Sequence, residues 1–447
     1  MLIRGLENIK KVYFIGIGGI SMSALAKLLS TLGYEVSGSD KVGGEQTKQL
    51  AFYNIPVYIG EDVNCKALRG ADVVVYTDAV PMDNPLLEMA KKSNKTVLSR
   101  GELLGLVAGA FRNVITVAGS HGKTTCSSFC AHVLKATGMP FTAHIGGEDS
   151  FFGNFHYAGD EFFITEACEY KRNLLKIPAD KSILLNIDLD HMECYKDKQD
   201  LIDCFKSYCN NAKTAFVCAD DDNCKGLGEF VTFGIENKLC DYRAVDLKAI
   251  NQRYSFVVEE YGKPICRIKL NALGKCNVYN ALASFAVMRS YGFDEKIIKS
   301  GLETFSAVKR RFEYIGKYNE VSFIADYAHH PKELVSTIAT AKGICKGKLY
   351  VVFQPHTYSR TKHLMQDFIL SLKDVENLMV YKTYPAREKF DEEGSGKRLA
   401  EKIGCLYAEN IYTLKTWIKR TVKEGDIVLF LGAGDIYYGA QYLLKSM

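Results

Sequence analysis

The sequence predicts an α/β fold of three domains: a Rossmann-like N-terminal domain, a central P-loop ATPase-like domain and a C-terminal Rossmann-like domain. Two glycine turns, at residues 16–19 and 119–122, each follow an apolar strand pattern and precede a helical one. Strand and helix patterns alternate along most of the chain, which favours parallel sheets with helices on both faces. Because this pattern changes near residues 107 and 308, we expect domains at 1–107, 108–308 and 309–447.

The composition is typical of a globular protein with several cores. The chain has 447 residues, of which 47% are hydrophobic and 24% charged. A net charge of +5 is small for this length and gives no reason to expect a nucleic-acid partner. The 14 cysteines include no C-x-x-C pair, so we expect free thiols and a cytoplasmic location. No apolar run approaches the ~18 residues of a membrane span, so we predict no membrane insertion.

The central glycine turn predicts an ATP site. The strand pattern Val114–Ala118 leads into Gly119-Ser-His-Gly-Lys-Thr-Thr125, and helical spacing then runs to Ala136. Glycines let backbone N–H groups approach a phosphate, and the helix N-terminus adds partial positive charge. Only two residues separate the glycines, against four in the usual P-loop, and a chance Gly-Lys-Thr is the alternative. The predicted ATP-binding residues here are Gly119, Ser120, His121, Gly122, Lys123, Thr124 and Thr125.

The N-terminal glycine turn predicts a diphosphate site. A strand pattern from Lys11 ends at the turn Gly16-Ile-Gly-Gly-Ile-Ser21, helical spacing follows, and a second strand ends at Asp40. This is the start of a βαβ unit, which binds a diphosphate at its helix N-terminus. A dinucleotide fingerprint needs Gly or Ala where Ser21 stands. Another diphosphate, such as a UDP-sugar, is therefore favoured, and NAD stays the alternative.

A metal site is predicted where two strands of the central domain end. Glu166 ends the strand pattern from Phe162, and Asn-Ile-Asp-Leu-Asp-His191 overlaps the end of a strand pattern at 181–187. The carboxyl ends of parallel strands are where α/β sheets place ligands. Magnesium prefers oxygen ligands and is often shared with phosphates. The alternative is that Asp190-His191 caps the next helix. The predicted metal ligands are Thr124, Glu166 and His191.

The remaining chain divides into two regions. Residues 230–270 show short alternating strand patterns, which predict an antiparallel excursion at the edge of the central domain. Beyond residue 308, strands are predicted near 321–325, 348–353 and 427–431. Histidines and arginines cluster at the strand ends of this last region, and arginine suits carboxylate or phosphate. The adjacent His329 and His330, if on a strand, point to opposite faces and so do not share a metal. A solvated charged edge is the alternative.

Taken together, these motifs resemble the Mur ligase family. The motifs are Gly-Ser-His-Gly-Lys-Thr-Thr, Asn-Ile-Asp-x-Asp-His, Asn277-x-x-Asn280, Arg-Arg-Phe-Glu, Asp-Tyr-Ala-His-His-Pro and Phe-Gln-Pro-His. They follow in order along nearly the whole chain, and the likeness is greatest to the members that add L-alanine to UDP-N-acetylmuramate. The resemblance implies ATP-dependent ligation of L-alanine to the lactyl carboxylate through an acyl phosphate, giving ADP and phosphate, in peptidoglycan precursor synthesis. It implies ATP and Mg²⁺ as cofactors, and we expect a monomer or homodimer.

The resemblance also implies roles for individual residues. Those implied for the UDP-sugar are Gly16, Gly18, Gly19, Ser21 and Asp40. Those implied for the nucleotide, beyond the central turn, are Asn277, Asn280, Arg311 and Asp326. Those implied for the amino acid are Tyr327, His329, His356 and Arg360. Those implied for catalysis are Lys123, Glu166, His191 and His329.

The sequence departs from the alanine-adding pattern at several positions: where that pattern has Glu-Ala-Asp-Glu-Ser-Asp, this chain has Glu166-Ala-Cys168-Glu169-Tyr170-Lys171. Cys168 stands for an aspartate, Cys276 for a histidine and Thr357 for an arginine. Lys206 lies near a position that some relatives carbamylate, but its helical pattern is amphipathic and we assign it no such role. Three alternatives stay open: a related ligase that attaches a whole peptide to the same sugar, a nicotinamide-dependent oxidoreductase, and a non-catalytic nucleotide sensor.

Overall fold

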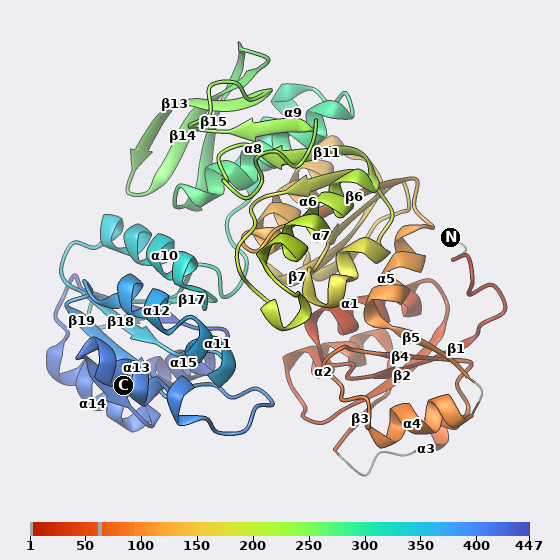
Figure 1. Ribbon diagram of the computed structural model, residues 1–447, viewed down its shortest axis with the longest axis horizontal. Coiled ribbons are helices and arrows are strands. Elements are labelled where there is room, and N and C mark those ends of the chain that lie inside the picture. Colours follow the sequence, from red (N-terminus) through yellow and green to blue (C-terminus); the bar gives the residue numbers. More distant parts are fainter. Residues whose placement is uncertain (1–2, 61–64, 94) are drawn as a thin grey trace. The chain divides into compact units, whose positions relative to one another are not determined.

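The computed structural model describes residues 3–60, 65–93 and 95–447 (Figure 1). These residues form three sheets of five, ten and six strands, each accompanied by helices. The chain divides into two compact units. The first holds residues 1–247, 255–270 and 277–306, and the second holds 248–254, 271–276 and 307–447. The three-domain α/β class is confirmed, and the domain limits at 107 and 308 stay predictions.

The N-terminal sheet is parallel throughout, in the order β3-β2-β1-β4-β5. Its strands are β1 (Lys11–Ile15), β2 (Glu35–Asp40), β3 (Val57–Ile59), β4 (Val73–Tyr76) and β5 (Thr96–Ser99). Its helices are α1 (Ile20–Thr31), α2 (Glu45–Leu50), the 3₁₀ turn η1 (Ala51–Tyr53), α3 (Cys65–Arg69), α4 (Pro85–Lys92) and α5 (Arg100–Ala108). The strand order changes direction between β1 and β4. Ligands of open α/β sheets bind at such a point, and the first glycine turn directly follows β1.

The ten-stranded sheet has the order β15-β14-β13-β12-β11-β10-β6-β9-β7-β8. Its strands are β6 (Asn113–Ala118), β7 (Phe141–Asp149), β8 (Gly153–Tyr157), β9 (Phe162–Glu166), β10 (Ala179–Leu184), β11 (Ala212–Cys218), β12 (Val231–Gly234), β13 (Tyr242–Ile250), β14 (Arg253–Glu260) and β15 (Lys263–Leu273). Its helices and 3₁₀ turns are α6 (Lys123–Thr137), η2 (Tyr170–Lys176), η3 (Met192–Cys194), α7 (Lys198–Asn210), α8 (Cys276–Ser290) and α9 (Glu295–Thr304). The second glycine turn lies between β6, near the middle of the sheet, and α6.

Two predictions about this sheet need correction. The strand expected at 181–187 ends at Leu184, because Leu185 bonds to Ala118 O and the next residues turn toward the glycine loop. The strands expected to be short over 230–270 include β13, β14 and β15, which have 9, 8 and 11 residues. They do lie at the edge of the sheet as predicted, but β12 pairs with β13 in parallel.

The C-terminal sheet has the order β16-β17-β21-β18-β19-β20 and is parallel except for the edge pair β16–β17. Its strands are β16 (Glu313–Tyr318), β17 (Val321–Asp326), β18 (Leu349–Phe353), β19 (Asn377–Tyr381), β20 (Leu406–Ala408) and β21 (Ile427–Leu431). Its helices are α10 (Pro331–Ile344), α11 (Tyr358–His363), α12 (Met365–Leu372), the 3₁₀ turn η4 (Glu392–Gly394), α13 (Gly396–Ile403), α14 (Ile411–Thr421) and α15 (Ile436–Ser446). The single tryptophan, Trp417 on α14, packs edge-on against Tyr350 of β18, with ring centroids 5.5 Å apart.

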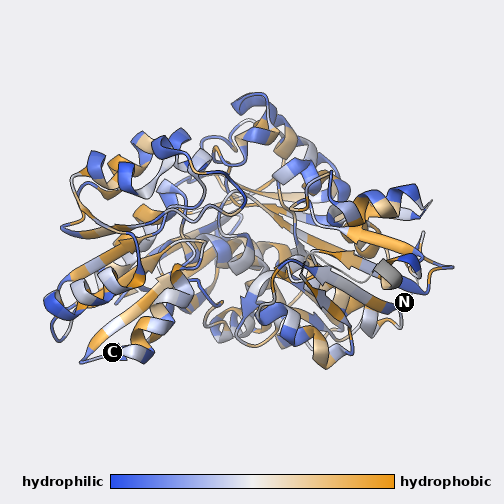
Figure 2. Ribbon diagram, turned by 90° about the horizontal axis from the view of Figure 1, so that it is seen from below, coloured by the Kyte–Doolittle hydropathy of each residue, from blue (hydrophilic) through white to orange (hydrophobic). Residues whose placement is uncertain are grey.

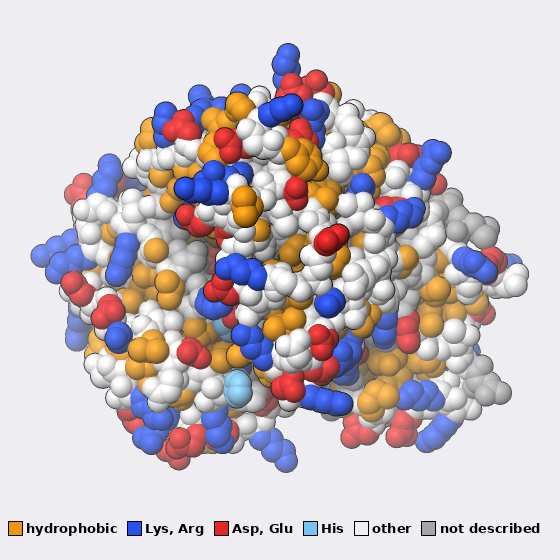
Figure 3. Space-filling model, turned by 45° about the horizontal axis from the view of Figure 1, so that its top comes forward, with side chains coloured by type: hydrophobic (Ala, Val, Ile, Leu, Met, Phe, Trp, Pro, Cys, Tyr) orange, Lys and Arg blue, Asp and Glu red, His pale blue; other side chains and the backbone are white. Residues whose placement is uncertain are grey.

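The central strands of all three sheets are apolar, as expected where helices cover both faces (Figure 2). The β21 sequence, Ile-Val-Leu-Phe-Leu, is buried throughout. Acidic and basic side chains are interspersed over the face shown in Figure 3. Among the described residues, no helix combines the length and apolarity needed to cross a bilayer.

Candidate active site

The central glycine turn adopts a conformation that requires its two glycines. Gly119 has φ +135°, and Gly122, the residue just before α6, has φ +87°. A Cβ on Gly122 would lie 2.7 Å from Oδ1 of Asn280. No side chain caps the start of α6, so its first backbone N–H groups stay available to an anion.

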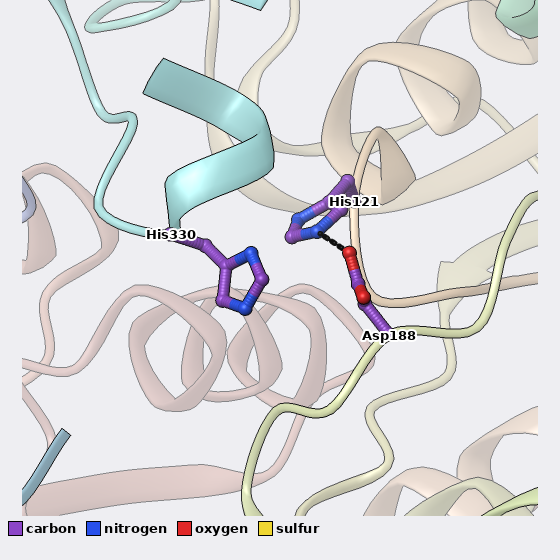
Figure 4. Close-up of side chains that lie close together, drawn as sticks. All are labelled: His121, Asp188 and His330. Carbon is purple, nitrogen blue, oxygen red and sulfur yellow. Dashed lines mark hydrogen bonds and ion pairs between the residues drawn. The ribbon is translucent and has the colours of Figure 1, made fainter. Parts of the chain in front are cut away.

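The loop after β10 holds this turn in place. Asn186 Oδ1 accepts a hydrogen bond from His121 N (2.8 Å), and Asn186 Nδ2 donates to His121 O (3.1 Å). Asp188 N donates to Ser120 Oγ (2.7 Å), and His121 Nε2 lies 3.1 Å from Asp188 Oδ2 (Figure 4, where His330 of the second unit is also drawn). The side chains of Ser120 and His121 therefore brace the turn. The role of these two residues in ATP binding stays a prediction.

Lys123 is held at this turn by a buried carboxylate. Its ammonium lies 3.0 and 3.2 Å from the two carboxylate oxygens of Glu169, which is 1% exposed. The ammonium also donates to Ser120 O (3.2 Å) and to Gly119 O. Burial alone would lower the pKa of Lys123, but the charge of Glu169, aided by Glu166, outweighs burial and raises it. Lys123 therefore stays protonated at every physiological pH.

The structure brings together three side chains able to bind a metal ion, and this set differs from the predicted one. One donor atom each from Glu169, Asp190 and His191 lies within 4.8 Å of the other two. Two carboxylates and an imidazole, with oxygen in the majority, fit a divalent cation that is shared with phosphate. Of the predicted set, His191 belongs to this group. Thr124 is buried in the first turn of α6.

Glu166 instead faces a neighbouring strand. Its Oε1 accepts a hydrogen bond from Gly146 N (2.6 Å) and lies 3.5 Å from Ser127 Oγ. A Cβ on Gly146 would lie 2.5 Å from the Glu166 carboxylate, so the close approach depends on glycine. The alternative that His191 caps a helix is not supported, because only the three-residue turn η3 follows and the His191 side chain makes no capping hydrogen bond.

The two asparagines implied for the nucleotide lie at the start of α8. Asn280 is buried, and its Nδ2 donates to Asn277 Oδ1 (3.0 Å). Its proximity to Gly122 places this end of α8 beside the phosphate turn. Contact of either residue with a nucleotide stays a prediction.

The N-terminal glycine turn is fixed by the strand beside it. Gly16 has φ +81°, and its N–H donates to Ser39 O (2.8 Å). Gly18 N donates to Asp40 Oδ2 (2.8 Å), so Asp40 supports the turn directly. Gly19 begins α1 without a side-chain cap. Ser21, in the first turn of α1, lies 2.9 Å from Nε2 of His144.

The four residues predicted to bind the amino acid lie together in the second unit. The Tyr327 and His329 ring centroids are 5.3 Å apart, and those of His329 and His356 are 5.8 Å apart. Nη1 of Arg360 lies 3.2 Å from His356 Nδ1. His329 and His330 follow the end of β17 and lead into α10, so the premise that they share a strand was wrong.

Arg311 and Asp326 flank the same group. Asp326 accepts hydrogen bonds from the N–H groups of Phe312 and Ala328, each at 2.7 Å. Burial raises the pKa of Asp326 to about 6, against the opposing charge of Arg311. The Arg311 guanidinium lies 4.9 Å from the Tyr327 ring centroid, where a cation–π contact is favourable.

Sequence reasoning assigned no role to three residues that shape the first unit. Asn186 begins the Asn-Ile-Asp-Leu-Asp-His191 motif, and Glu169 follows three residues after the end of β9, so closeness to a strand end was the available signal. His144 lies within the β7 strand and carries no such signal, since its contacts come from distant parts of the chain.

Comparison with known proteins covers all three parts of the chain. Family models match residues 11–112 (Mur ligase family, catalytic domain), 117–288 (Mur ligase middle domain) and 310–434 (Mur ligase, glutamate ligase domain). The chain is 37% identical to the UDP-N-acetylmuramate–L-alanine ligase of Clostridium tetani, over 98% of this chain and 99% of that protein. It is also 37% identical to the enzyme of that name from Caldicellulosiruptor saccharolyticus, over 95% and 96%.

Solved structures agree with this relationship. A UDP-N-acetylmuramate–alanine ligase from Thermotoga maritima is 27% identical, with a TM-score of 0.84 and 98% of both chains covered. A murein peptide ligase from Psychrobacter arcticus shares the fold, with a TM-score of 0.76 at 22% identity. On the strength of the full-length relatives, the chain belongs to the Mur ligase family.

Proposed function

We propose that this protein is a UDP-N-acetylmuramate–L-alanine ligase. It uses ATP to join L-alanine to the lactyl carboxylate of UDP-N-acetylmuramate, with release of ADP and phosphate, and so supplies a peptidoglycan precursor. Its near full-length identity of 37% with relatives of that name supports the proposal. The structural observation that carries it is Lys123, paired with the buried Glu169 at an uncapped helix start, beside a group of residues able to bind a metal.

The first chemical step is phosphoryl transfer to the lactyl carboxylate. The backbone N–H groups of residues 119–125 bind the ATP phosphates, and Lys123 neutralises the charge that gathers as two anions meet. Mg²⁺ would be held by Glu169, Asp190 and His191, and it would neutralise phosphate charge. Thr124 and Glu166 stay predicted as further ligands. The N-terminal turn from Gly16 to Ser21 binds the UDP diphosphate and so anchors the sugar.

The second step is attack of the alanine amine on the acyl phosphate, which expels phosphate. Arg360 binds the α-carboxylate, supported by His356 at 3.2 Å. His329 Nδ1 lies 3.0 Å from the carbonyl oxygen of Tyr327, which only accepts, so Nδ1 carries the ring proton. The basic nitrogen is therefore Nε2, which can take the proton that the alanine ammonium loses.

The alternative functions explain fewer of these structural features. A nicotinamide-dependent oxidoreductase leaves Lys123 and its buried partner without a role, and a nucleotide sensor does not need Arg360. A peptide-adding ligase differs only where the amino acid binds. The murein peptide ligase from Psychrobacter arcticus is 22% identical, against 37% for the alanine ligases, which favours alanine.

The deciding experiment measures phosphate release with ATP, Mg²⁺ and UDP-N-acetylmuramate against single amino acids and the tripeptide L-Ala-γ-D-Glu-meso-diaminopimelate. We expect turnover with L-alanine, weaker turnover with glycine or L-serine, and a product mass equal to that of the UDP-sugar plus one alanine residue. Turnover with the tripeptide alone would assign the protein to peptide recycling. We further propose a cytoplasmic monomer or homodimer, because ATP and nucleotide sugars are cytoplasmic, and sedimentation analysis can test the assembly.

A further inference from the structure

A buried histidine connects the N-terminal glycine turn with the strand that leads into the active site. His144 lies on β7 (Phe141–Asp149), a strand that packs beside α1 (Figure 1). Its side chain is almost fully buried. Its Nε2 is 2.9 Å from Ser21 Oγ in α1, and its Nδ1 is 2.8 Å from Thr165 Oγ1 in β9. Thr165 precedes Glu166. One imidazole therefore joins three elements of the first unit.

The surrounding atoms determine which ring nitrogen carries the proton. Besides Ser21 Oγ, Nε2 also faces the backbone oxygen of Ser21 at 3.3 Å, and a carbonyl oxygen only accepts hydrogen bonds. Nε2 is therefore the protonated nitrogen. Nδ1 is then the acceptor, and the Thr165 hydroxyl, which also lies 3.3 Å from the backbone oxygen of Glu166, directs its proton to the nearer Nδ1 at 2.8 Å. Burial, with a smaller effect from Arg100, lowers the pKa of His144 to about 4, so this neutral form holds at pH 7.

A second donor reaches the same serine oxygen. Arg100, the first residue of α5, follows directly on the carboxyl end of β5, and its Nη1 donates to Ser21 Oγ at 3.4 Å. A hydroxyl oxygen accepts two hydrogen bonds through its lone pairs. With His144 and Arg100 as donors, both lone pairs are occupied. The Ser21 hydroxyl can then only donate its own proton. It lies in the first turn of α1, and a helix N-terminus favours the binding of an anion.

We propose that His144 is a positioning residue that orients the Ser21 hydroxyl as a donor to the diphosphate of the UDP-sugar and keeps Arg100 beside the same turn. This inference rests on the proposed function. His144 would then affect the affinity for the UDP-sugar and have no role in ATP binding.

Two substitutions at His144 separate the two ring nitrogens. His144→Gln places an amide donor near the position of Nε2 and keeps the bond to Ser21, whereas His144→Asn reaches only the position of Nδ1. We expect His144→Asn to weaken UDP-N-acetylmuramate binding in calorimetry by about fivefold or more, the effect of one hydrogen bond. We expect His144→Gln to stay within about twofold of the wild type, and KM for ATP to change by less than about twofold in both variants.

A double substitution tests whether His144 acts through Ser21. Ser21→Ala should weaken UDP-N-acetylmuramate binding on its own, and adding His144→Asn should then cost nothing further. Independent, multiplying effects would overturn the proposal, as would equal binding by the Asn and Gln variants. If His144→Asn does not fold, long-range ¹H–¹⁵N spectra of the histidine-labelled wild type decide. Assigned through His144→Gln, they should show the Nε2–H tautomer of His144, and the Nδ1–H tautomer would contradict the proposal.

These outcomes are distinct from failure of the proposed function. If the wild type binds no UDP-N-acetylmuramate and releases no phosphate with L-alanine, the assignment of the substrate is wrong. If the wild type is active but the His144 variants bind the sugar nucleotide as it does, only the role of His144 is wrong.

Discussion

The ammonium of Lys123 lies 3.0 Å from Oε2 of Glu169, a carboxylate almost completely removed from solvent. A buried ion pair is costly to break from one side, because the remaining charge then has no partner. The pair therefore fixes the lysine at the glycine turn and ties the turn to residues that can bind a metal. Each member of the pair can be tested separately.

Removing the lysine should abolish ligation. We expect Lys123→Ala to retain less than about a tenth of wild-type turnover, because it removes the cation that faces the transferring phosphate. The measurement is phosphate release with all three substrates, with circular dichroism as the check on folding. Turnover above that level in a folded variant would contradict the assigned role.

Neutralising the carboxylate should act mainly on the metal. Glu169→Gln removes one of two negative charges from the Glu169–Asp190–His191 group. We expect the Mg²⁺ concentration for half-maximal activity to rise by about tenfold or more. Asp203→Asn, on the exposed face of α7, is the control and should leave Mg²⁺ dependence unchanged. If the two variants respond alike, Glu169 serves Lys123 alone.

A methyl group at Gly146 should displace Glu166. The added Cβ would lie 2.5 Å from that carboxylate, and the backbone at Gly146 is not in the left-handed region, so the effect is steric. We expect Gly146→Ala to lower kcat by about tenfold while KM for L-alanine changes little. Gly44→Ala is the matched control, because nothing lies within 4 Å of its Cβ position. Normal kcat in Gly146→Ala would show that the position of Glu166 is unimportant.

Arg360 is expected to anchor the amino acid. Arg360→Ala should raise KM for L-alanine by at least about tenfold, equivalent to about 1.4 kcal/mol, with smaller changes for ATP and UDP-N-acetylmuramate. Lys362→Ala, two residues further along α11, removes an exposed cation that pairs with Asp391 and should have no such effect. If the KM values for all three substrates rise together, or if none of them rises, Arg360 is not the anchor.

The lowered pKa of His144 predicts a dependence of stability on pH. In the unfolded chain this imidazole titrates near its ordinary value of 6.5, whereas in the fold burial lowers its pKa to about 4. Between these values the unfolded state binds the extra proton, so stability falls as the pH is lowered through this window. The slope reaches at most about 1.4 kcal/mol per pH unit.

The test compares the wild type with His144→Gln, in which this group does not titrate. Unfolding of the protein in urea, followed by far-UV circular dichroism at several pH values between 5 and 7, should show the wild type losing stability relative to the variant on acidification. A constant difference across this range would show that His144 has an ordinary pKa in the fold.

Features encoded by neighbouring residues could be predicted from the sequence, and features that depend on distant residues could not. The β6–turn–α6 unit follows from local apolar spacing and glycine, and it was predicted correctly. The end of β10 was not, because Leu185 and Ile187 read as strand residues although they are buried outside the sheet. The start of α10 was missed despite Pro331, which favours a first helical position.

The same distinction holds in the candidate site. Motifs indicated His191 and the group around Arg360, since each lies at the end of a strand or the start of a helix. The partner of Lys123 is 46 positions away in the chain, and that of Ser21 is 123 positions away. Contacts of that kind depend on which strand lies beside which helix. The sequence pattern predicts that each element exists but not which other elements it packs against.

The packing of Trp417 against Tyr350 has a practical consequence for spectroscopy. As the only indole in the chain, it lies wholly within the second unit, on a helix of the six-stranded sheet. Selective excitation near 295 nm therefore yields emission from that unit alone, without any label. Fluorescence will report melting of the C-terminal sheet while remaining silent about the glycine turns of the first unit. A tryptophan introduced into α1 or α5 would supply the missing signal.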